Sequence, residues 1–177
     1  MNTIETARLR LRPMVESDAA FLLEVLNEPA FIRNVGHRGV RTVPDAVTYM
    51  RERIITQYER HGFGMWLVEL ADTREPVGIC GLIKRDSLKD IDLGFSFLER
   101  FWSRGFALEA ARAALREGWE VLKLSRIVAI VAPHNDASIR LLSKLGFELE
   151  KKVRLAPEEQ ELLLLATEPP AKGKAAR

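Results

Sequence analysis

The feature that most constrains this chain is a strand-like run that passes through a short loop into a helix. The segment from Phe95 to Ala107 reads FSFLERFWSRGFA, and an amphipathic helix pattern follows it directly. Gly105 opens that helix and has no Cβ, so an anion can approach the backbone closely. The first turn of a helix has unpaired N–H groups and a dipole that favours negative charge. The segment therefore predicts an anion site, with Arg104 adding charge at its rim. A plain helix start with Gly105 in a turn is the alternative.

A second motif lies farther along the chain. Asn135 and Ser138 stand three residues apart at the start of a short predicted helix, which ends at the run Lys144-Leu145-Gly146-Phe147. Asparagine is a favoured N-cap residue, so capping alone would explain Asn135. Each motif by itself is weak evidence, and together, in this order and at this spacing, they indicate a family.

Composition excludes several classes of protein. The chain has 177 residues, an apolar share of 47% and a formal net charge of +2, which do not indicate a nucleic-acid binder. Cys80 is the single cysteine, so an intrachain disulfide and a thiolate metal cluster are excluded. No apolar stretch approaches the roughly 18 residues that a membrane helix needs, and the N-terminus lacks the pattern of a secretory signal. We expect a cytoplasmic protein.

Hydrophobic periodicity predicts the order of the elements. Seven strands are expected at 9–14, 64–71, 76–84, 91–98, 127–132, 147–155 and 160–167. Four helices are expected at 19–27, 43–60, 106–122 and 135–145, with a short turn at 31–35. This order predicts one α/β (α+β) domain over residues 1–168, followed by a flexible tail at 169–177.

The element order and both motifs resemble the GNAT superfamily of acyl-CoA-dependent N-acyltransferases, and within it the ribosomal-protein N-terminal acetyltransferase branch. The opening Thr6-Ala7-Arg8-Leu9-Arg10-Leu11-Arg12 is similar to the start of that branch, and Leu93-Gly94-Phe95 is similar to its fourth strand. The resemblance implies a mixed sheet that is splayed between strands four and five. It also implies a pyrophosphate loop at Trp102–Ala107.

The loop departs from the family pattern at two positions. Trp102 stands where the superfamily has Gln or Arg, and Ser103 stands where the branch usually has Gly. Neither change removes the backbone donors, so acetyl-CoA binding remains the expectation. The coenzyme-binding residues that the resemblance implies are Phe97, Leu98, Trp102, Ser103, Arg104, Gly105, Phe106, Ala107, Asn135 and Ser138. For Phe97 and Leu98, simple core packing is the alternative.

The chemistry needs a base for the acceptor ammonium and an acid for the thiolate. Asp92 is the candidate base, acting through water, and an exposed strand carboxylate is the alternative. Ser138 is the candidate acid, and a helix-start serine that bonds the backbone is its alternative. Many superfamily members have a tyrosine where this chain has Leu142, so that route to the thiolate is missing. Cys80 is expected to be a small buried hydrophobe rather than a nucleophile.

These observations predict an acetyl-CoA-dependent N-acetyltransferase that acetylates a primary amine by direct attack in a ternary complex. The acceptor is a protein N-terminal α-amine or a small-molecule amine. No metal, nucleic acid or membrane is expected as a partner, and a homodimer is left open. The alternative is a GNAT-like domain that binds an acyl-CoA as a sensor and catalyses nothing.

Overall fold

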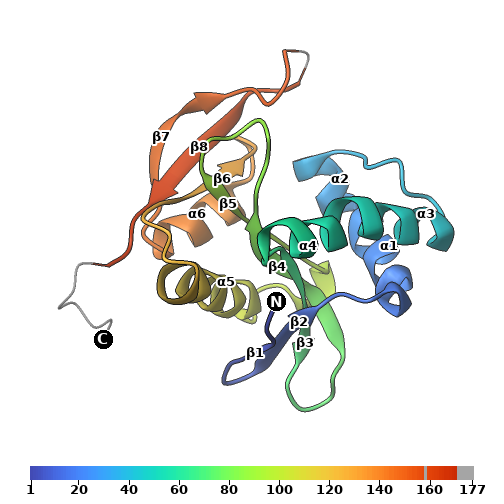
Figure 1. Ribbon diagram of the computed structural model, residues 1–177. Coiled ribbons are helices and arrows are strands. Elements are labelled where there is room, and N and C mark those ends of the chain that lie inside the picture. Colours follow the sequence, from blue (N-terminus) through green and yellow to red (C-terminus); the bar gives the residue numbers. More distant parts are fainter. Residues whose placement is uncertain (158, 171–177) are drawn as a thin grey trace.

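A single mixed sheet forms the centre of the computed structural model, which describes residues 1–157 and 159–170 (Figure 1). The expected tail lies outside the described residues from 171 onward. The strands are ordered β1-β2-β3-β4-β5-β6-β8-β7 across the sheet. Their bounds are β1 Ile4–Glu5, β2 Leu9–Pro13, β3 Met65–Leu70, β4 Pro76–Ile83, β5 Ile91–Phe97, β6 Ile127–Val131, β7 Glu148–Val153 and β8 Leu162–Thr167. The seven expected strands are confirmed, and the two-residue β1 is an addition.

The expected splay lies between β5 and β6, the fourth and fifth strands predicted from the sequence. These two strands run parallel and are paired only at Ile91↔Ile127 and Asp92↔Val128, whereas every other neighbouring pair is antiparallel. β5 continues to Phe97 and β6 continues to Val131 without further pairing to each other. The carboxyl ends of two adjacent strands therefore diverge in the middle of the sheet.

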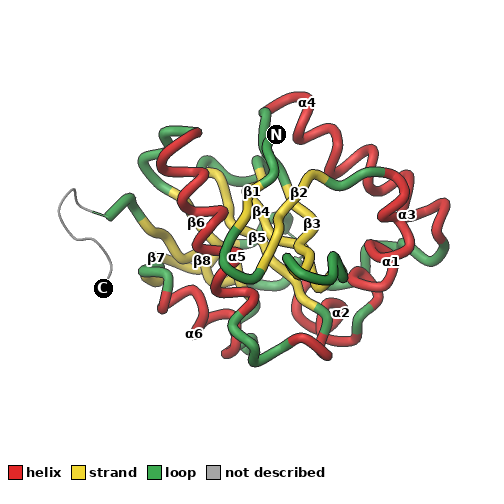
Figure 2. The backbone as a smooth tube through the Cα atoms, turned by 90° about the horizontal axis from the view of Figure 1, so that it is seen from below, coloured by secondary structure: helices red, strands yellow, loops and turns green. Residues whose placement is uncertain are grey.

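Helices cover the two faces of the sheet unequally (Figures 1 and 2). α5 packs on β2, β4 and β5, and α6 packs on β6 on the same face. α1 to α4 lie on the other side of the sheet. The helical segments are α1 Ala19–Asn27, α2 Pro29–Val35, α3 Val43–Tyr49, α4 Thr56–His61, α5 Phe106–Arg116 and α6 Asp136–Lys144. No helix in the described ranges is long and apolar enough to cross a membrane.

Local sequence signals explain where most helices begin and end. Thr42 and Asp45 form a reciprocal capping box at α3, and Gly62 ends α4 in the left-handed conformation. The predicted helix at 43–60 is one continuous helical run whose middle, Met50–Ile55, is π-helical. The predicted helix at 106–122 likewise ends in a π-helical turn, Glu117–Val121. The short turn expected at 31–35 is part of a complete helix, α2, because Pro29 occupies its first position.

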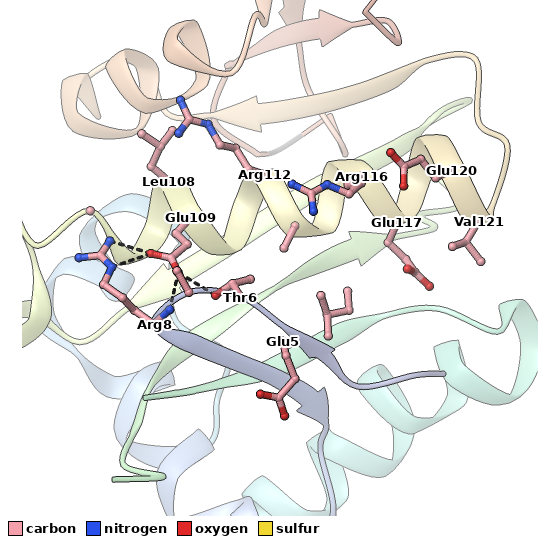
Figure 3. Close-up of a pocket in the computed structure, with 14 residues that line it drawn as sticks. Glu5, Thr6, Arg8, Leu108, Glu109, Arg112, Arg116, Glu117, Glu120 and Val121 are labelled. Carbon is pink, nitrogen blue, oxygen red and sulfur yellow. Dashed lines mark hydrogen bonds and ion pairs between the residues drawn. The ribbon is translucent and has the colours of Figure 1, made fainter. Parts of the chain in front are cut away.

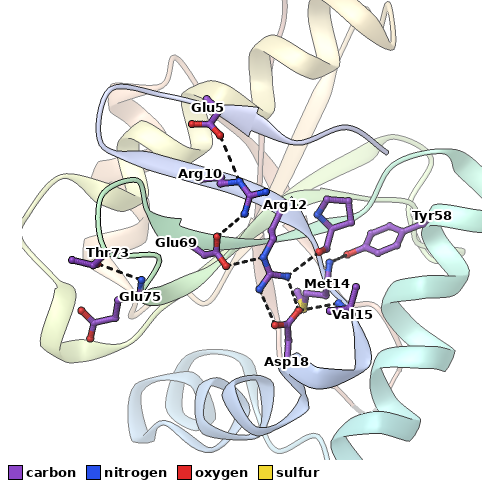
Figure 4. A network of polar contacts seen from close by, with 11 residues as sticks. Glu5, Arg10, Arg12, Met14, Val15, Asp18, Tyr58, Glu69, Thr73 and Glu75 are labelled. Atoms are coloured by element: carbon purple, nitrogen blue, oxygen red, sulfur yellow. Dashed lines mark hydrogen bonds and ion pairs between the residues drawn. The ribbon is translucent and has the colours of Figure 1, made fainter.

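An ion-pair network holds α1 against the outer strands (Figure 4). Arg12 on β2 donates to Glu69 on β3 at 2.7 Å and makes a bidentate pair with Asp18 at 2.7 and 2.8 Å. Glu69 is nearly buried and also accepts from Arg10 at 3.1 Å. A buried carboxylate is stable only when its oxygens are paired, and here two arginines supply the donors. The network fixes the outer edge of the domain, away from the splay.

Candidate active site

The backbone of β5 directs N–H and C=O groups at the splay. Leu98 donates its N–H to Val77 O at 3.1 Å, so the alternation of an antiparallel ladder turns the N–H and C=O groups of Phe95 and Phe97 away from β4. On that side β6 has already diverged. An extended, amide-containing ligand can pair with such an unpaired strand edge as an added strand does.

Of the two residues expected at the end of this strand, only Phe97 keeps a group directed at the splay. The Leu98 N–H is bonded to Val77, the Leu98 carbonyl accepts from Phe101 N at 2.9 Å, and the Leu98 side chain is fully buried. Leu98 is therefore a core residue of this region, as the packing alternative held. Phe97 retains its N–H as a donor.

Trp102 fastens the loop to the end of the strand. Its indole Nε1 donates to Phe97 O at 2.7 Å, and its side chain is 44% exposed. This bond ties the loop before α5 to Phe97, the last residue of β5.

The turn before α5 contains two left-handed residues in close succession. Ser103 has φ 61° and Gly105 has φ 79°, with Arg104 between them. A side chain at left-handed φ is strained, which accounts for the family's glycine where this chain has Ser103. The first intrahelical bond of α5 runs from Glu109 N to Gly105 O at 3.1 Å, so the N–H groups of Phe106, Ala107 and Leu108 precede the ladder. These donors, with Gly105, can cradle an anion.

A second helix N-terminus flanks the splay at the end of β6. Asn135 caps α6, because its Oδ1 accepts from Ser138 N at 3.2 Å. The cap uses only the oxygen, and within the described part of the chain the Nδ2 donors of Asn135 and the Ser138 hydroxyl make no hydrogen bond to protein. Both residues are half-buried. Capping and ligand binding are therefore compatible at Asn135. In open α/β sheets, ligands bind outside the carboxyl ends of parallel strands, where these two helices begin.

Asp92 is a buried, paired carboxylate rather than the exposed one that formed the alternative. Its side chain is 1% exposed, and Arg85 Nε donates to its Oδ1 at 2.9 Å. Burial raises the pKa of Asp92, while the Arg85 guanidinium opposes that rise by its charge and its hydrogen bond. Asp92 stands at the last β5–β6 rung, where the splay begins.

The side chain of Asp92 lies on the face of the sheet opposite to α5. Side chains alternate along a strand, so Asp92 shares its face with Gly94, whose nearest neighbours are Ile83 and Met65 on the side of α4. The face of α5 is occupied instead by residues such as Leu82, which contacts Gly118. The anion cradle and the carboxylate are therefore separated by the sheet, and the splay is the opening between them.

Cys80 is fully buried on β4, and burial raises the pKa of its thiol. A buried neutral thiol is a poor nucleophile, as expected for a packing residue. Within residues 1–157 and 159–170, no group of three or more His, Cys, Asp or Glu side chains is arranged to hold a metal ion.

Two arginines near these groups were not singled out from the sequence. Arg85 reaches Asp92 from seven positions upstream, and Arg8 reaches the turn before α5 from the N-terminal segment (Figure 3). Arg8 also lines a pocket of about 460 Å³ between β1 and α5, which shares Gly105 and Leu108 with the anion cradle. The signal for Arg8 was present in the N-terminal motif, but its partner is about a hundred residues away.

Comparisons with known proteins agree with this arrangement. The family model described as "Acetyltransferase (GNAT) domain" matches residues 8–148. The uncharacterized N-acetyltransferase YoaA of Bacillus subtilis is 30% identical over 85% of this chain and 85% of its own length. The [Ribosomal protein uS5]-alanine N-acetyltransferase of Escherichia coli is 35% identical over 45% of this chain and 42% of its own length. The structure of RimL, a ribosomal L7/L12 α-N-protein acetyltransferase in complex with coenzyme A, superposes with a TM-score of 0.79 at 18% identity, covering 94% of this chain and 98% of the other.

The expected fold and the expected relation to ribosomal-protein acetyltransferases are confirmed by these matches. At 18% identity the RimL structure shows the fold alone, whereas the family model covers most of the chain. The chain therefore belongs to the GNAT acetyltransferase family.

Proposed function

We propose that this acetyltransferase uses acetyl-CoA to acetylate a primary amine by direct attack in a ternary complex. The observation that carries the proposal is the splay of β5 and β6, flanked at its carboxyl end by the N-termini of α5 and α6. Acetyl-CoA would supply a thioester, an activated acyl group. The chain supplies the cradle, the strand edge and the proton acceptor.

The turn and first helical residues fit the pyrophosphate of the coenzyme. The unpaired N–H groups of Phe106, Ala107 and Leu108 and the positive end of the α5 dipole favour an anion. Gly105 leaves the space that a Cβ would fill. Ser103 and Arg104 belong to the same turn, and Trp102 holds it against Phe97.

The strand edge and the second helix fit the pantetheine arm and the thioester. Phe95 and Phe97 offer backbone groups along the splay, and the Phe97 N–H can polarise the thioester oxygen. Within the described residues the amide donors of Asn135 make no hydrogen bond to protein, and they can bond an arm carbonyl. Ser138 is the candidate donor to the departing thiolate, because its hydroxyl makes no hydrogen bond to protein within the described residues.

Asp92 would accept the proton of the acceptor ammonium through water. Phe95 and Phe97 follow it by three and five residues, which is about 10 and 17 Å along a strand. That separation exceeds the reach of a direct hydrogen bond and of one bridging water, so the proposal requires a chain of several waters through the splay. Arg85 offsets the burial of Asp92 and so favours its ionised, proton-accepting form.

For the acceptor we propose a protein N-terminal α-amine, with a small-molecule amine as the second class. The first rests on the similarity to the uS5-alanine acetyltransferase over part of the chain. A panel of N-terminal peptides and small amines, assayed by thiol release from acetyl-CoA, tests both classes.

A non-catalytic acyl-CoA sensor is the rival function, and two observations favour it. Asp92 is already paired with Arg85, and Leu142 occupies the position of the family's tyrosine. The same assay decides between the two functions. Amine-dependent thiol release supports the enzyme, whereas tight acetyl-CoA binding without release from any amine supports the sensor.

A further inference from the structure

Glu109 joins the N-terminal segment to the first turn of α5 (Figure 3). Its Oε1 accepts from Thr6 Oγ1 at 2.7 Å and from Arg8 N at 2.9 Å. Its Oε2 accepts from Arg8 Nε at 2.7 Å and lies 2.7 Å from Arg8 Nη2. The Glu109 side chain is 19% exposed, so four short contacts meet on a largely covered carboxylate.

Thr6 is itself held in place, which makes the N-terminal end of this contact rigid. Its N–H donates to Leu9 O at 2.9 Å, its hydroxyl lies 3.1 Å from the same oxygen, and Leu9 N donates to its Oγ1 at 3.0 Å. Leu9 is a buried residue of β2. Glu109 is therefore anchored to the sheet through Thr6.

Arg8 extends this anchor to the turn that forms the anion cradle. Its Nη1 donates to Arg104 O at 2.9 Å, and Arg104 is the residue between the left-handed Ser103 and Gly105. Its guanidinium also lies over the Phe106 ring, 4.9 Å from the centroid. The position that a Cβ on Gly105 would take is 3.3 Å from Arg8 Nη2. One side chain thus contacts the turn before, at and after Gly105.

This geometry differs from that of an ordinary surface ion pair. An exposed pair contributes little because two long side chains must be ordered. Here Arg8 Nε donates to Glu109 Oε2, Nη2 lies 2.7 Å from the same oxygen, and Nη1 donates to the backbone carbonyl of Arg104. Charge-assisted hydrogen bonds of this kind are stronger than neutral ones. They fix a turn whose left-handed Ser103 would otherwise relax. A binding loop that is already in its bound shape loses less entropy when the ligand arrives.

We infer that Arg8 and Glu109 form a brace that holds the Ser103–Gly105 turn in the shape that receives the coenzyme pyrophosphate. Arg8 and Glu109 are then positioning residues for coenzyme binding. This inference rests on the proposed function.

Glu109→Gln separates this inference from simple electrostatics. Removing a negative charge beside a phosphate site should tighten anion binding if charge alone matters. The brace has the opposite consequence, because the neutral amide has one acceptor oxygen where Glu109 uses two, and its NH2 group would face the donors of Arg8 or Thr6. We expect calorimetry to give a Kd for acetyl-CoA that is about tenfold higher in Glu109→Gln and in Arg8→Gln, as loss of a charge-assisted bond implies. Arg8→Lys should not restore affinity. Lysine keeps the charge but has no guanidinium group that could bond both Glu109 and the Arg104 carbonyl.

Arg116→Gln is the matched control for Arg8→Gln. It removes the same positive charge from the same pocket, at a position two turns beyond Glu109 along α5. Its Kd should stay within about twofold of the parent value. Thr6→Val provides a milder variant in case the others fold poorly, because it removes the hydroxyl that bonds Glu109 and Leu9 N but leaves the Arg8–Glu109 pair in place. We expect its Kd to rise about threefold. Parent affinity in Glu109→Gln, Arg8→Gln and Thr6→Val, or full rescue by Arg8→Lys, would overturn the brace.

Acetyl-pantetheine, which lacks the pyrophosphate, distinguishes positioning from general damage to the fold. Its affinity, followed by NMR titration, should be the same in the parent and in the brace variants, and a parallel loss for both ligands would overturn the inference. A parent protein that does not bind acetyl-CoA would overturn the proposed function and the brace together. A parent that binds acetyl-CoA, with variants that bind equally well, would overturn the brace alone.

Discussion

The two sides of the splay are built in different ways. On the side of α5, the cradle consists of backbone N–H groups at a helix start, and Trp102 and Arg8 fix the turn from two directions. On the other face, one carboxylate, Asp92, is the base that we propose, and its state is set by burial and by Arg85. Under the proposed function, binding of the coenzyme is spread over many groups, whereas proton transfer is concentrated in one. The difference predicts that the two functions can be lost independently.

Asp92→Asn should give the largest effect on turnover. Loss of a general base lowers kcat by a factor of about 10²–10⁴, while the Kd for acetyl-CoA should stay near the parent value because Asp92 lies away from the cradle. Burial raises the pKa of Asp92 above its ordinary 3.8, so the parent kcat should rise with pH through that higher value. The loss in Asp92→Asn should shrink at high pH, where the acceptor amine is already neutral.

Asp90→Asn is the matched control for this prediction. Asp90 lies two residues upstream and is also paired with an arginine, accepting from Arg126 Nε at 3.1 Å. Its replacement should leave the pH–rate profile unchanged. Parent turnover in Asp92→Asn across the pH range would show that another group or the solvent takes the proton.

Replacing Asn135 tests whether coenzyme binding can be separated from capping of α6. Asn135→Ala should lose the α6 cap, about 1 kcal/mol, together with a coenzyme hydrogen bond. Asn135→Asp keeps an oxygen for the cap but removes the amide donor. We therefore expect thermal melting to show restored stability in Asn135→Asp, and calorimetry to show a Kd for acetyl-CoA that remains raised. If Asn135→Asp restores both, capping is its whole role.

Ser103 should give the smallest effect. Its left-handed backbone favours glycine, so Ser103→Gly should stabilise the fold by about 1 kcal/mol, or about 2–4 °C in Tm. Lys123→Gly is the control, since Lys123 also has a positive φ (55°) but lies outside the cradle. Both variants should gain stability, and acetyl-CoA affinity should be unchanged in both. A weaker affinity in Ser103→Gly alone would mean that the Ser103 side chain stabilises the bound turn.

The cradle could be predicted from the sequence because its parts are local. A glycine at a helix start and an Asn-x-x-Ser helix are contiguous signals, and both strands that form the splay have strong apolar patterns. The two-residue β1 could not be predicted, since two residues carry no periodicity. The π-helical segments keep the apolar spacing of an α-helix closely enough to be read as one.

The environment of Asp92 and the role of Arg8 could not be predicted from the sequence because both depend on tertiary contacts. Asp92 stands on a strand whose alternation allows either an exposed or a buried side chain. Its pKa also depends on Arg85, which opposes the rise that burial causes. Arg8 and Glu109 are 101 residues apart, so no local pattern links them. Contacts of this length come from the fold, which brings β2 alongside α5.

Calorimetry of Gly105→Glu shows whether the α5 N-terminus holds the phosphates of acetyl-CoA, as we propose. Gly62→Glu is the matched control, because Gly62 has nearly the same left-handed φ, 75° against 79°, and receives the same charge at the end of α4. We expect 1:1 binding of acetyl-CoA to the parent and to Gly62→Glu, and an affinity about a hundredfold or more weaker in Gly105→Glu, where a carboxylate meets the pyrophosphate. Parent affinity in a folded Gly105→Glu variant would contradict this proposal.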